Sequence, residues 1–159
     1  MLWNKRIDVR LTILPEHFER LFVKISGNTI LITGGTSGIG LGLALRFHKA
    51  GNKVIVAGRR KELLDRISTD HPGIEAVVLD VADSASIARA SEAIAARYPE
   101  LNVLINNAGI MHWEDVRDSA GLQIAEDTIT TNLLGSIRMV YAFEALVDKT
   151  VASPCADVV

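Results

Sequence analysis

The stretch TGGTSGIG, residues 33–40, decides the fold of this chain. It follows an apolar run at residues 29–32 and precedes an amphipathic segment at residues 41–50. A strand that turns through glycines into a helix gathers backbone amides and the positive end of the helix dipole at one point, and both attract a pyrophosphate. We therefore expect this segment to bind a phosphate-containing ligand rather than to be a plain glycine-rich turn.

The glycines have the spacing G-x-x-x-G-x-G, which differs from the commoner G-x-G-x-x-G but follows the same physical logic. Gly34 permits the tight turn out of the strand, Gly38 lets the main chain approach a diphosphate, and Gly40 allows the helix to pack closely against the sheet. Two hydroxyl side chains between the glycines can add hydrogen bonds. The candidate ligand contacts of this segment are Gly34, Thr36, Ser37, Gly38, Ile39 and Gly40.

Beyond this turn the chain alternates between strand-like and helix-like segments. We expect strands at residues 29–32, 53–57, 74–79 and 101–105, and helices at residues 38–50, 60–69, 84–98 and 122–148. The strands are short, apolar and β-branched rather than alternating, which is typical of a parallel sheet with helices on both faces. The expected fold class is therefore α/β, a doubly wound parallel sheet.

The two ends of the chain carry separate expectations. Residues 156–159 look like the first half of a fifth strand, so we expect a sheet that is incomplete at its C-terminal edge. Residues 1–22 form an N-terminal extension that alternates like a strand over residues 7–13. The extension is either a genuine extra element or a non-native start. We favour the second, because the nucleotide-binding pattern in residues 23–159 is complete without it.

Bulk composition excludes several classes of protein. The chain has 159 residues, 48% of them hydrophobic and 23% charged, which suits one globular domain. A formal net charge of -2 gives no general attraction for nucleic acid. The single cysteine, Cys155, excludes an internal disulfide, and the four histidines lack ligand spacing, so we expect no metal site. No apolar run is long enough to span a membrane and no secretory signal is recognisable, so we expect a cytoplasmic protein.

A second motif, NNAG at residues 106–109, follows the expected strand at residues 101–105. Ligands in open α/β sheets bind outside the carboxyl ends of the strands, where the strand order reverses. We therefore expect the first and fourth strands to be neighbours on either side of that crevice. Asn107, Ala108 and Gly109 are the candidate contacts there.

Together with two further motifs, these segments resemble the short-chain dehydrogenase/reductase family. The matching segments are T-G-x-x-x-G-I-G at residues 33–40, Asp80-Val81 after the third strand, NNAG at residues 106–109 and Asn132 within TTNLLG at residues 130–135. The sequence from residue 33 to 47 is also similar to a bacterial branch often named after the lipoteichoic acid D-alanylation operon, a name that fixes no substrate. The resemblance covers about residues 25–159 and implies a Rossmann-type fold.

The resemblance also implies an activity and roles for single residues. Family members transfer a hydride between a nicotinamide cofactor and a small-molecule carbonyl or alcohol. By this resemblance Asp80 contacts the adenine amino group, Val81 lies beside the adenine ring, and Asn132 is the asparagine of the catalytic tetrad, which holds a proton-relay water through its backbone. Helices of this family often pair across a subunit interface, so a homo-oligomer through residues 122–148 is possible. The alternative is that the apolar stripe of this helix (Ile129, Leu133, Ile137 and Val140) only packs into the core.

The end of the second strand predicts which nicotinamide cofactor is bound. NAD-binding domains usually carry an acidic residue there, but this chain has Arg59 and Arg60 and no carboxylate. Guanidinium groups can clamp a 2′-phosphate, which a carboxylate would repel. We therefore expect NADP(H) to be preferred, with NAD(H) possible and Arg59 as the main contact. The alternative is that both arginines merely begin a solvated helix.

The family's proton donor is a tyrosine followed four residues later by a lysine, with a serine upstream, and this chain ends before such a pattern appears. Tyr98 is followed at that spacing by Asn102, and Tyr141 by Ala145. We therefore expect an oxidoreductase chain that lacks part of the catalytic site and turns over little substrate. The alternatives are a non-catalytic NADP(H)-binding regulatory domain or an inactive truncated product.

Overall fold

The computed structural model describes residues 25–115, 117, 119 and 121–150, and only the backbone of residues 148–150. The expected strand pattern at residues 7–13, Cys155 and the expected half-strand at residues 156–159 lie outside the described residues. The assignment of residues 1–22 to an extension therefore stays a prediction.

The centre of the fold is a four-stranded parallel sheet in the order β3-β2-β1-β4. Its strands are β1 (Thr29–Thr33), β2 (Lys53–Gly58), β3 (Ile74–Val78) and β4 (Val103–Ile105). β4 begins two residues later than expected. β1 pairs with β4 in the register Ile30 to Val103, so the predicted neighbours are confirmed. The strand order reverses between them, which places the topological switch point at the end of β1.

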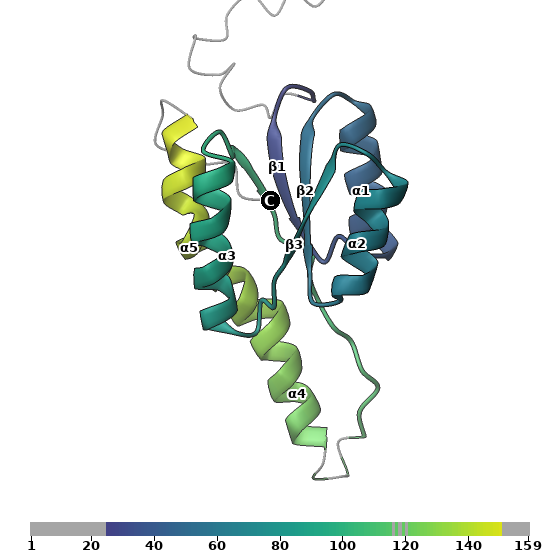
Figure 1. The fold of residues 1–159 in the computed structure, drawn as a ribbon. Helices are drawn as coiled ribbons and strands as arrows, with labels where there is room; N and C mark the ends of the chain where they lie inside the picture. The colour runs from purple at the N-terminus through teal and green to yellow at the C-terminus, as the bar shows by residue number, and fades with distance from the viewer. Residues whose placement is uncertain (1–24, 116, 118, 120, 151–159) are drawn as a thin grey trace, which may run out of the picture.

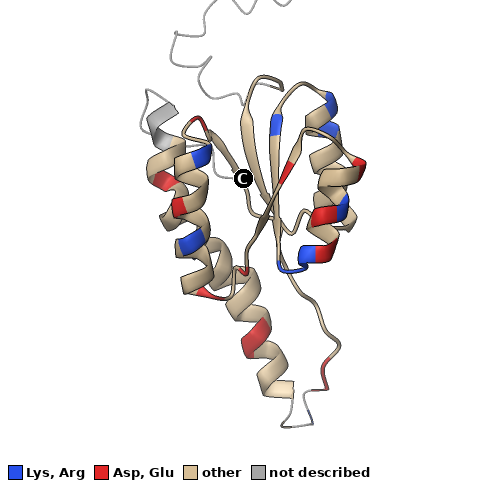
Figure 2. Cartoon of the chain, viewed as in Figure 1, with Lys and Arg blue, Asp and Glu red and all other residues tan. Residues whose placement is uncertain are grey.

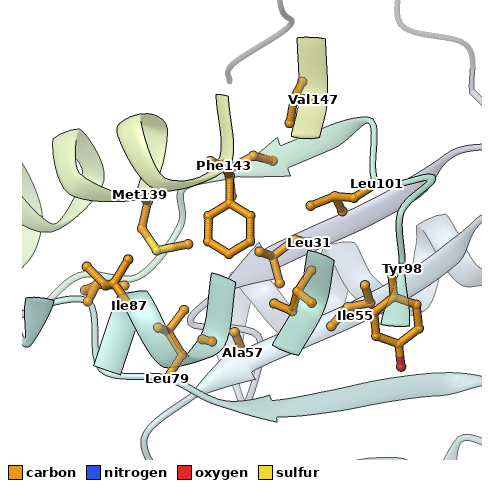
Figure 3. Close-up of a cluster of buried hydrophobic side chains, with 14 residues drawn as sticks. Leu31, Ile55, Ala57, Leu79, Ile87, Tyr98, Leu101, Met139, Phe143 and Val147 are labelled. Atoms are coloured by element: carbon orange, nitrogen blue, oxygen red, sulfur yellow. The ribbon is translucent and has the colours of Figure 1, made fainter. Parts of the chain in front are cut away.

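Helices cover both faces of the sheet (Figure 1). α1 (Gly38–Lys49) and α2 (Lys61–Asp70) lie on one face, and α3 (Ser84–Arg97) and α5 (Gly135–Thr150) lie on the other. Successive strand residues point to opposite faces, so Ile30 and Ile32 pack toward α1 and α2 while Leu31 packs toward α3 and α5. The buried side chains on each face form one apolar cluster. Phe143 and Met139 of α5 belong to the cluster that contains Leu31 (Figure 3). The predicted doubly wound α/β fold is confirmed.

The segment expected as one helix at residues 122–148 is helical throughout but not regular. α4 (Gly121–Ile129) contains no buried residue and extends beyond the layer formed by α3 and α5 (Figure 1). A π-helical turn, Thr130–Leu134, joins it to α5. Such a turn inserts an extra residue and rotates the following helix about its axis.

The apolar stripe expected on this segment lies largely outside the core, so the alternative that it only packs into the core is wrong. Ile129, Leu133 and Ile137 are 54%, 56% and 43% exposed. The buried positions follow the same four-residue spacing but are offset by two residues, which is roughly the opposite side of a helix. They are Thr131, Gly135, Met139, Phe143 and Val147. This face begins with a threonine and a glycine, so the pattern of large apolar residues does not indicate it.

Tyr98, which follows α3, lies at the edge of the core cluster. Its side chain is buried, and its hydroxyl has no hydrogen-bond partner among the described residues. The hydroxyl points away from the apolar residues (Figure 3), and the guanidinium carbon of Arg97 lies 5.2 Å from the ring centroid. Burial, with a smaller contribution from the charge of Glu75, raises the pKa of Tyr98 to about 12.

This shift predicts a loss of stability at alkaline pH. The unfolded chain ionises Tyr98 near the ordinary value of about 10, so the contribution of the buried neutral phenol is complete below that pH and is lost as the pH rises toward 12. Tyr98→Phe should leave stability nearly unchanged at neutral pH. It should also remove about 3 kcal/mol of the alkaline loss, because a change of two pKa units corresponds to that energy. Urea unfolding across this pH range measures the effect, and the exposed Tyr141→Phe is the matched control. Parallel pH profiles for the wild type and Tyr98→Phe would contradict the account.

Candidate functional site

A cleft of about 420 Å³ lies over the carboxyl ends of the strands. Its walls come from the turn after β1, from residues 58–60 after β2, from residues 79–81 after β3, from residues 107–110 after β4, and from Thr131. The structure brings twelve of the predicted cofactor contacts to this cleft: Gly34, Thr36, Ser37, Ile39, Gly40, Arg59, Arg60, Asp80, Val81, Asn107, Ala108 and Gly109. Gly38 and Asn132 are not among the lining residues.

The glycine-rich turn has the geometry of an anion cradle. Gly34 has a φ of +67°, a left-handed conformation that favours glycine. The Ser37 side chain makes no capping hydrogen bond, and the Leu41 amide donates to the Ser37 carbonyl at 3.2 Å. The amides of residues 38–40 precede Leu41 at the N-terminal end of α1, where backbone N–H groups have no partner within the helix. These three amides are available at the positive end of the helix dipole.

Gly40 fixes how closely α1 approaches this turn. A Cβ atom at residue 40 would overlap the Gly34 carbonyl oxygen and the side-chain amide of Asn107. The close approach predicted from the sequence is therefore made to the loops that follow β1 and β4, at the base of the cleft. Gly42 lies two residues further along α1. A Cβ atom added there would meet nothing within 4 Å.

Thr33 joins the two loops on either side of the switch point, and sequence reasoning did not single it out as functional. Its buried hydroxyl accepts hydrogen bonds from the amides of Asn107 and Ala108, both at 3.0 Å. It also donates to the Ile105 carbonyl at 3.4 Å. The Asn107 side chain completes the link by donating to the Thr33 carbonyl at 3.0 Å. The signal that could have revealed Thr33 is its place as a polar residue at the end of an otherwise apolar strand.

The two arginines after β2 line the cleft but differ in their contacts. Arg60 donates to the hydroxyls of Thr36 at 3.1 Å and of Ser37 at 3.2 Å, so those hydroxyls act as acceptors rather than donors here. Arg59 is exposed and lines the cleft as well as a smaller cavity beside it. The β2–α2 turn forms a basic corner (Figure 2). Both predicted cations therefore line the cleft.

Asp80 is the only carboxylate among the described residues that line the cleft. Its Oδ1 accepts the Ala82 amide at 2.9 Å, and its own amide donates to the Ser86 hydroxyl at 3.0 Å. Val81 beside it is buried. The carboxylate thus shapes its own turn while lying next to an apolar wall, an arrangement suited to a flat ring that carries a donor group.

Asn132 lies in the π-helical turn and holds the loop after β4. Its Oδ1 accepts the Ile110 amide and its Nδ2 donates to the Ile110 carbonyl, both at 2.8 Å. Its backbone carbonyl accepts the Ser136 hydroxyl at 3.0 Å. The side chain therefore positions a wall of the cleft rather than lining it. Neither Tyr98 nor Tyr141 lines the cleft.

Two kinds of feature are absent from the described ranges. No helix there has both the length and the apolar character needed to cross a bilayer. Within the same residues, no cluster of three or more histidine, cysteine, aspartate or glutamate side chains could hold a metal ion.

Comparison with known proteins identifies the family. A model of the short chain dehydrogenase family matches residues 28–153. A Bacillus subtilis (strain 168) protein named uncharacterized oxidoreductase DltE is 43% identical over 95 residues, which are 60% of this chain and 38% of that protein. This similarity agrees with the bacterial branch that residues 33–47 resemble.

Solved structures of the family superpose well on the chain. A short chain dehydrogenase from Burkholderia cenocepacia in complex with NADP has a TM-score of 0.69 and 26% identity, over 80% of this chain and 52% of that one. A 3-ketoacyl-(acyl-carrier-protein) reductase from Brucella melitensis complexed with NADH has a TM-score of 0.72 and 28% identity, over 79% and 52%. The chain thus spans about half of these solved chains and less than half of the Bacillus relative. Because the family match covers nearly all described residues, including the sheet and the loops of the cleft, this chain belongs to the short-chain dehydrogenase family of oxidoreductases.

Proposed function

We propose that this chain binds a nicotinamide dinucleotide in the cleft over β1 and β4, with NADP(H) preferred over NAD(H). In the whole protein the bound cofactor would supply hydride transfer to or from the carbon of a small carbonyl or alcohol compound. The observation that carries the proposal is the meeting of the α1 amides, the hydroxyls of Thr36 and Ser37, and two guanidinium groups in one cleft.

The residues present fit the parts of such a cofactor. The amides of residues 38–40 would hold the pyrophosphate, since they precede the first hydrogen bond of α1 and Gly40 lets α1 lie close to the glycine-rich turn. Val81 would pack against the adenine ring, and the carboxylate of Asp80 would accept its amino group. Asn107, Ala108 and Gly109 would line the middle of the cleft, and Asn132 would act near the nicotinamide end by holding Ile110. We propose that residues 23–159 form one dinucleotide-binding domain. A cytoplasmic location stays a prediction from the sequence.

Arg59 is the residue that we assign to the 2′-phosphate. Arg60 is already bound to Thr36 and Ser37, so its fork of donors supports the glycine-rich turn. Arg59 is exposed beside the same turn. A guanidinium that gains a charged hydrogen-bonding partner gives a large affinity difference between ligands with and without the phosphate.

The cofactor preference gives a direct test. NADPH should bind at least about tenfold more tightly than NADH, and Arg59→Gln should remove about tenfold to a hundredfold of NADPH affinity while barely changing NADH affinity. Calorimetric titration of both cofactors measures this, with the exposed Arg66→Gln as the matched control. Equal affinities in the wild type, or a preference for NADH, would reject the role of Arg59.

The comparisons favour this oxidoreductase function over a non-catalytic regulator, because the similar proteins carry oxidoreductase, dehydrogenase or reductase names. The substrate is assigned only as a small carbonyl or alcohol compound.

We also propose that two copies of the chain can pair through residues 122–148. Ile129, Leu133, Ile137 and Tyr141 repeat every four residues and are all exposed, so none of the described residues covers this apolar stripe along α4 and α5. Sedimentation over a range of concentrations tests this, and a mass that stays monomeric throughout would reject it.

A further inference from the structure

The turn after β3, residues 79–83, forms one wall of the cleft and is held from two sides. On the α3 side, Ser86 accepts the Asp80 amide at 3.0 Å, and the carboxylate of Asp83 accepts the Ala85 amide at 2.9 Å to cap the helix. On the α5 side, Arg138 donates from Nη1 to the Ala82 carbonyl at 2.9 Å. This last bond joins residues 56 positions apart in the chain. Arg138 is half-buried and is not among the residues that line the cleft.

A second contact fastens α5 to the same turn. Gly135 is buried, and a Cβ there would lie 3.0 Å from both Cγ2 and the carbonyl oxygen of Val81. Gly135 and Arg138 are three residues apart on a helix, so both face the same neighbour. The backbone of α5 therefore lies directly against Val81 while the arginine side chain reaches the next carbonyl along the turn.

The same helical segment holds the opposite wall of the cleft. Asn132 binds both backbone groups of Ile110, in the loop after β4, at 2.8 Å each. The segment of residues 132–138 thus contacts both walls of the cleft. Its first residue binds the loop after β4, and its last residue binds the turn after β3. The π-helical turn at Thr130–Leu134 sets the rotation that allows both ends to reach their partners.

We infer that Arg138 is a positioning residue for nucleotide binding: its bond to the Ala82 carbonyl holds the β3 turn, with Asp80 and Val81, at the separation from the β4 loop that a dinucleotide requires. The nucleotide part of this inference rests on the proposed function. Arg138 acts without touching the ligand, by keeping the binding-competent arrangement of the cleft populated. The bond has a charged donor and is partly buried, so its loss weakens the attachment of the turn to α5. The hydrogen bond between the turn and Ser86 of α3 remains.

The test compares Arg138→Met with the wild type in two measurements. The first is calorimetric affinity for NADPH and for adenosine 2′,5′-bisphosphate, which carries only the adenine half. Arg138→Met should weaken both by about tenfold, because the affected turn contacts that half of the cofactor. The second is hydrogen exchange without ligand, in which the amides of Ala82 and Asp83 should exchange faster while those of residues 38–40 keep their rates. Arg138→Lys, which keeps a charged donor, should recover part of both effects.

Arg66→Met is the control, since it removes an exposed arginine of α2 away from the cleft. Unchanged exchange at Ala82 and Asp83, or nucleotide affinities equal to the wild type in the presence of faster exchange, would overturn the inference. If the wild type binds neither nucleotide, the proposed function fails by itself. The exchange measurement then still decides whether Arg138 holds the turn. If Arg138→Met does not fold, Arg138→Lys is judged by the same two measurements.

Discussion

Gly40→Ala should abolish useful nucleotide binding, with a loss of roughly a hundredfold or more in NADPH affinity. The added methyl group meets the Gly34 carbonyl oxygen and the Asn107 amide, and the carbonyl belongs to the backbone of the very turn that would hold the pyrophosphate. The carbonyl is backbone, and Asn107 Nδ2 is held by hydrogen bonds to the carbonyls of Thr33 and Gly34, so α1 must move away from the turn. Its first amides move with it, out of the position where they would meet an anion.

Gly42→Ala is the matched control, because it adds the same methyl group to the same helix. Nothing lies within 4 Å of that position, and the residue is exposed. Alanine there should leave NADPH affinity unchanged and raise stability by about 0.5–1 kcal/mol, because glycine lowers helix stability by that amount. Calorimetric titration and urea unfolding of both variants measure the contrast. NADPH affinity within threefold of the wild type in Gly40→Ala would refute this account of the turn.

Thr33→Val should produce the second large effect, a loss of about 2–4 kcal/mol in the free energy of unfolding together with weaker NADPH binding. Valine matches threonine in shape but cannot accept the amides of Asn107 and Ala108, which then lose their partner near the base of the cleft. Thr33 is only 2% exposed, so water does not readily replace the hydroxyl. The loop after β4 loses its link to β1, although the strands themselves keep their pairing.

Thr33→Ser separates the hydroxyl from the bulk of the side chain. Serine keeps the acceptor and should retain most of the NADPH affinity, while it loses some stability through the missing methyl group. Thr69→Val, on the exposed face of α2, removes a hydroxyl bonded only within its own helix and should change stability by less than about 0.5 kcal/mol. Equal stabilities of Thr33→Val and the wild type would show that the two amides do not depend on this hydroxyl.

The sheet and the cleft could be predicted from the sequence because their signals are local. Each strand is a short apolar run next to a helix-like segment, and the glycine-rich turn and NNAG follow the two strands that meet at the switch point. Right-handed connections between parallel strands then leave few arrangements open. The four strands and the first three helices therefore differ from the expected ones only by one or two residues at their ends.

The parts that the sequence did not predict depend on contacts between distant segments. The rotation of α5 follows from the π-helical turn, where Asn132 reaches a loop 22 residues away. The pattern of large apolar residues therefore indicated the exposed side, with Ile129 and Leu133, and did not indicate the buried side, with Thr131 and Gly135. The hydrogen bonds of Arg60 to Thr36 and Ser37 were also not predicted, because they join two loops at residues that are 24 and 23 positions apart in the sequence.

We propose that the pyrophosphate of a dinucleotide lies on the amides of residues 38–40. An NMR titration of the ¹⁵N-labelled chain with NADPH tests it most directly. We predict that the Gly38, Ile39 and Gly40 amide resonances shift most strongly and saturate together with those of Asp80 and Val81, while Gly42 changes little. Unmoved amides at residues 38–40 in a chain that binds NADPH, or no shifts anywhere at saturating NADPH, would contradict the account.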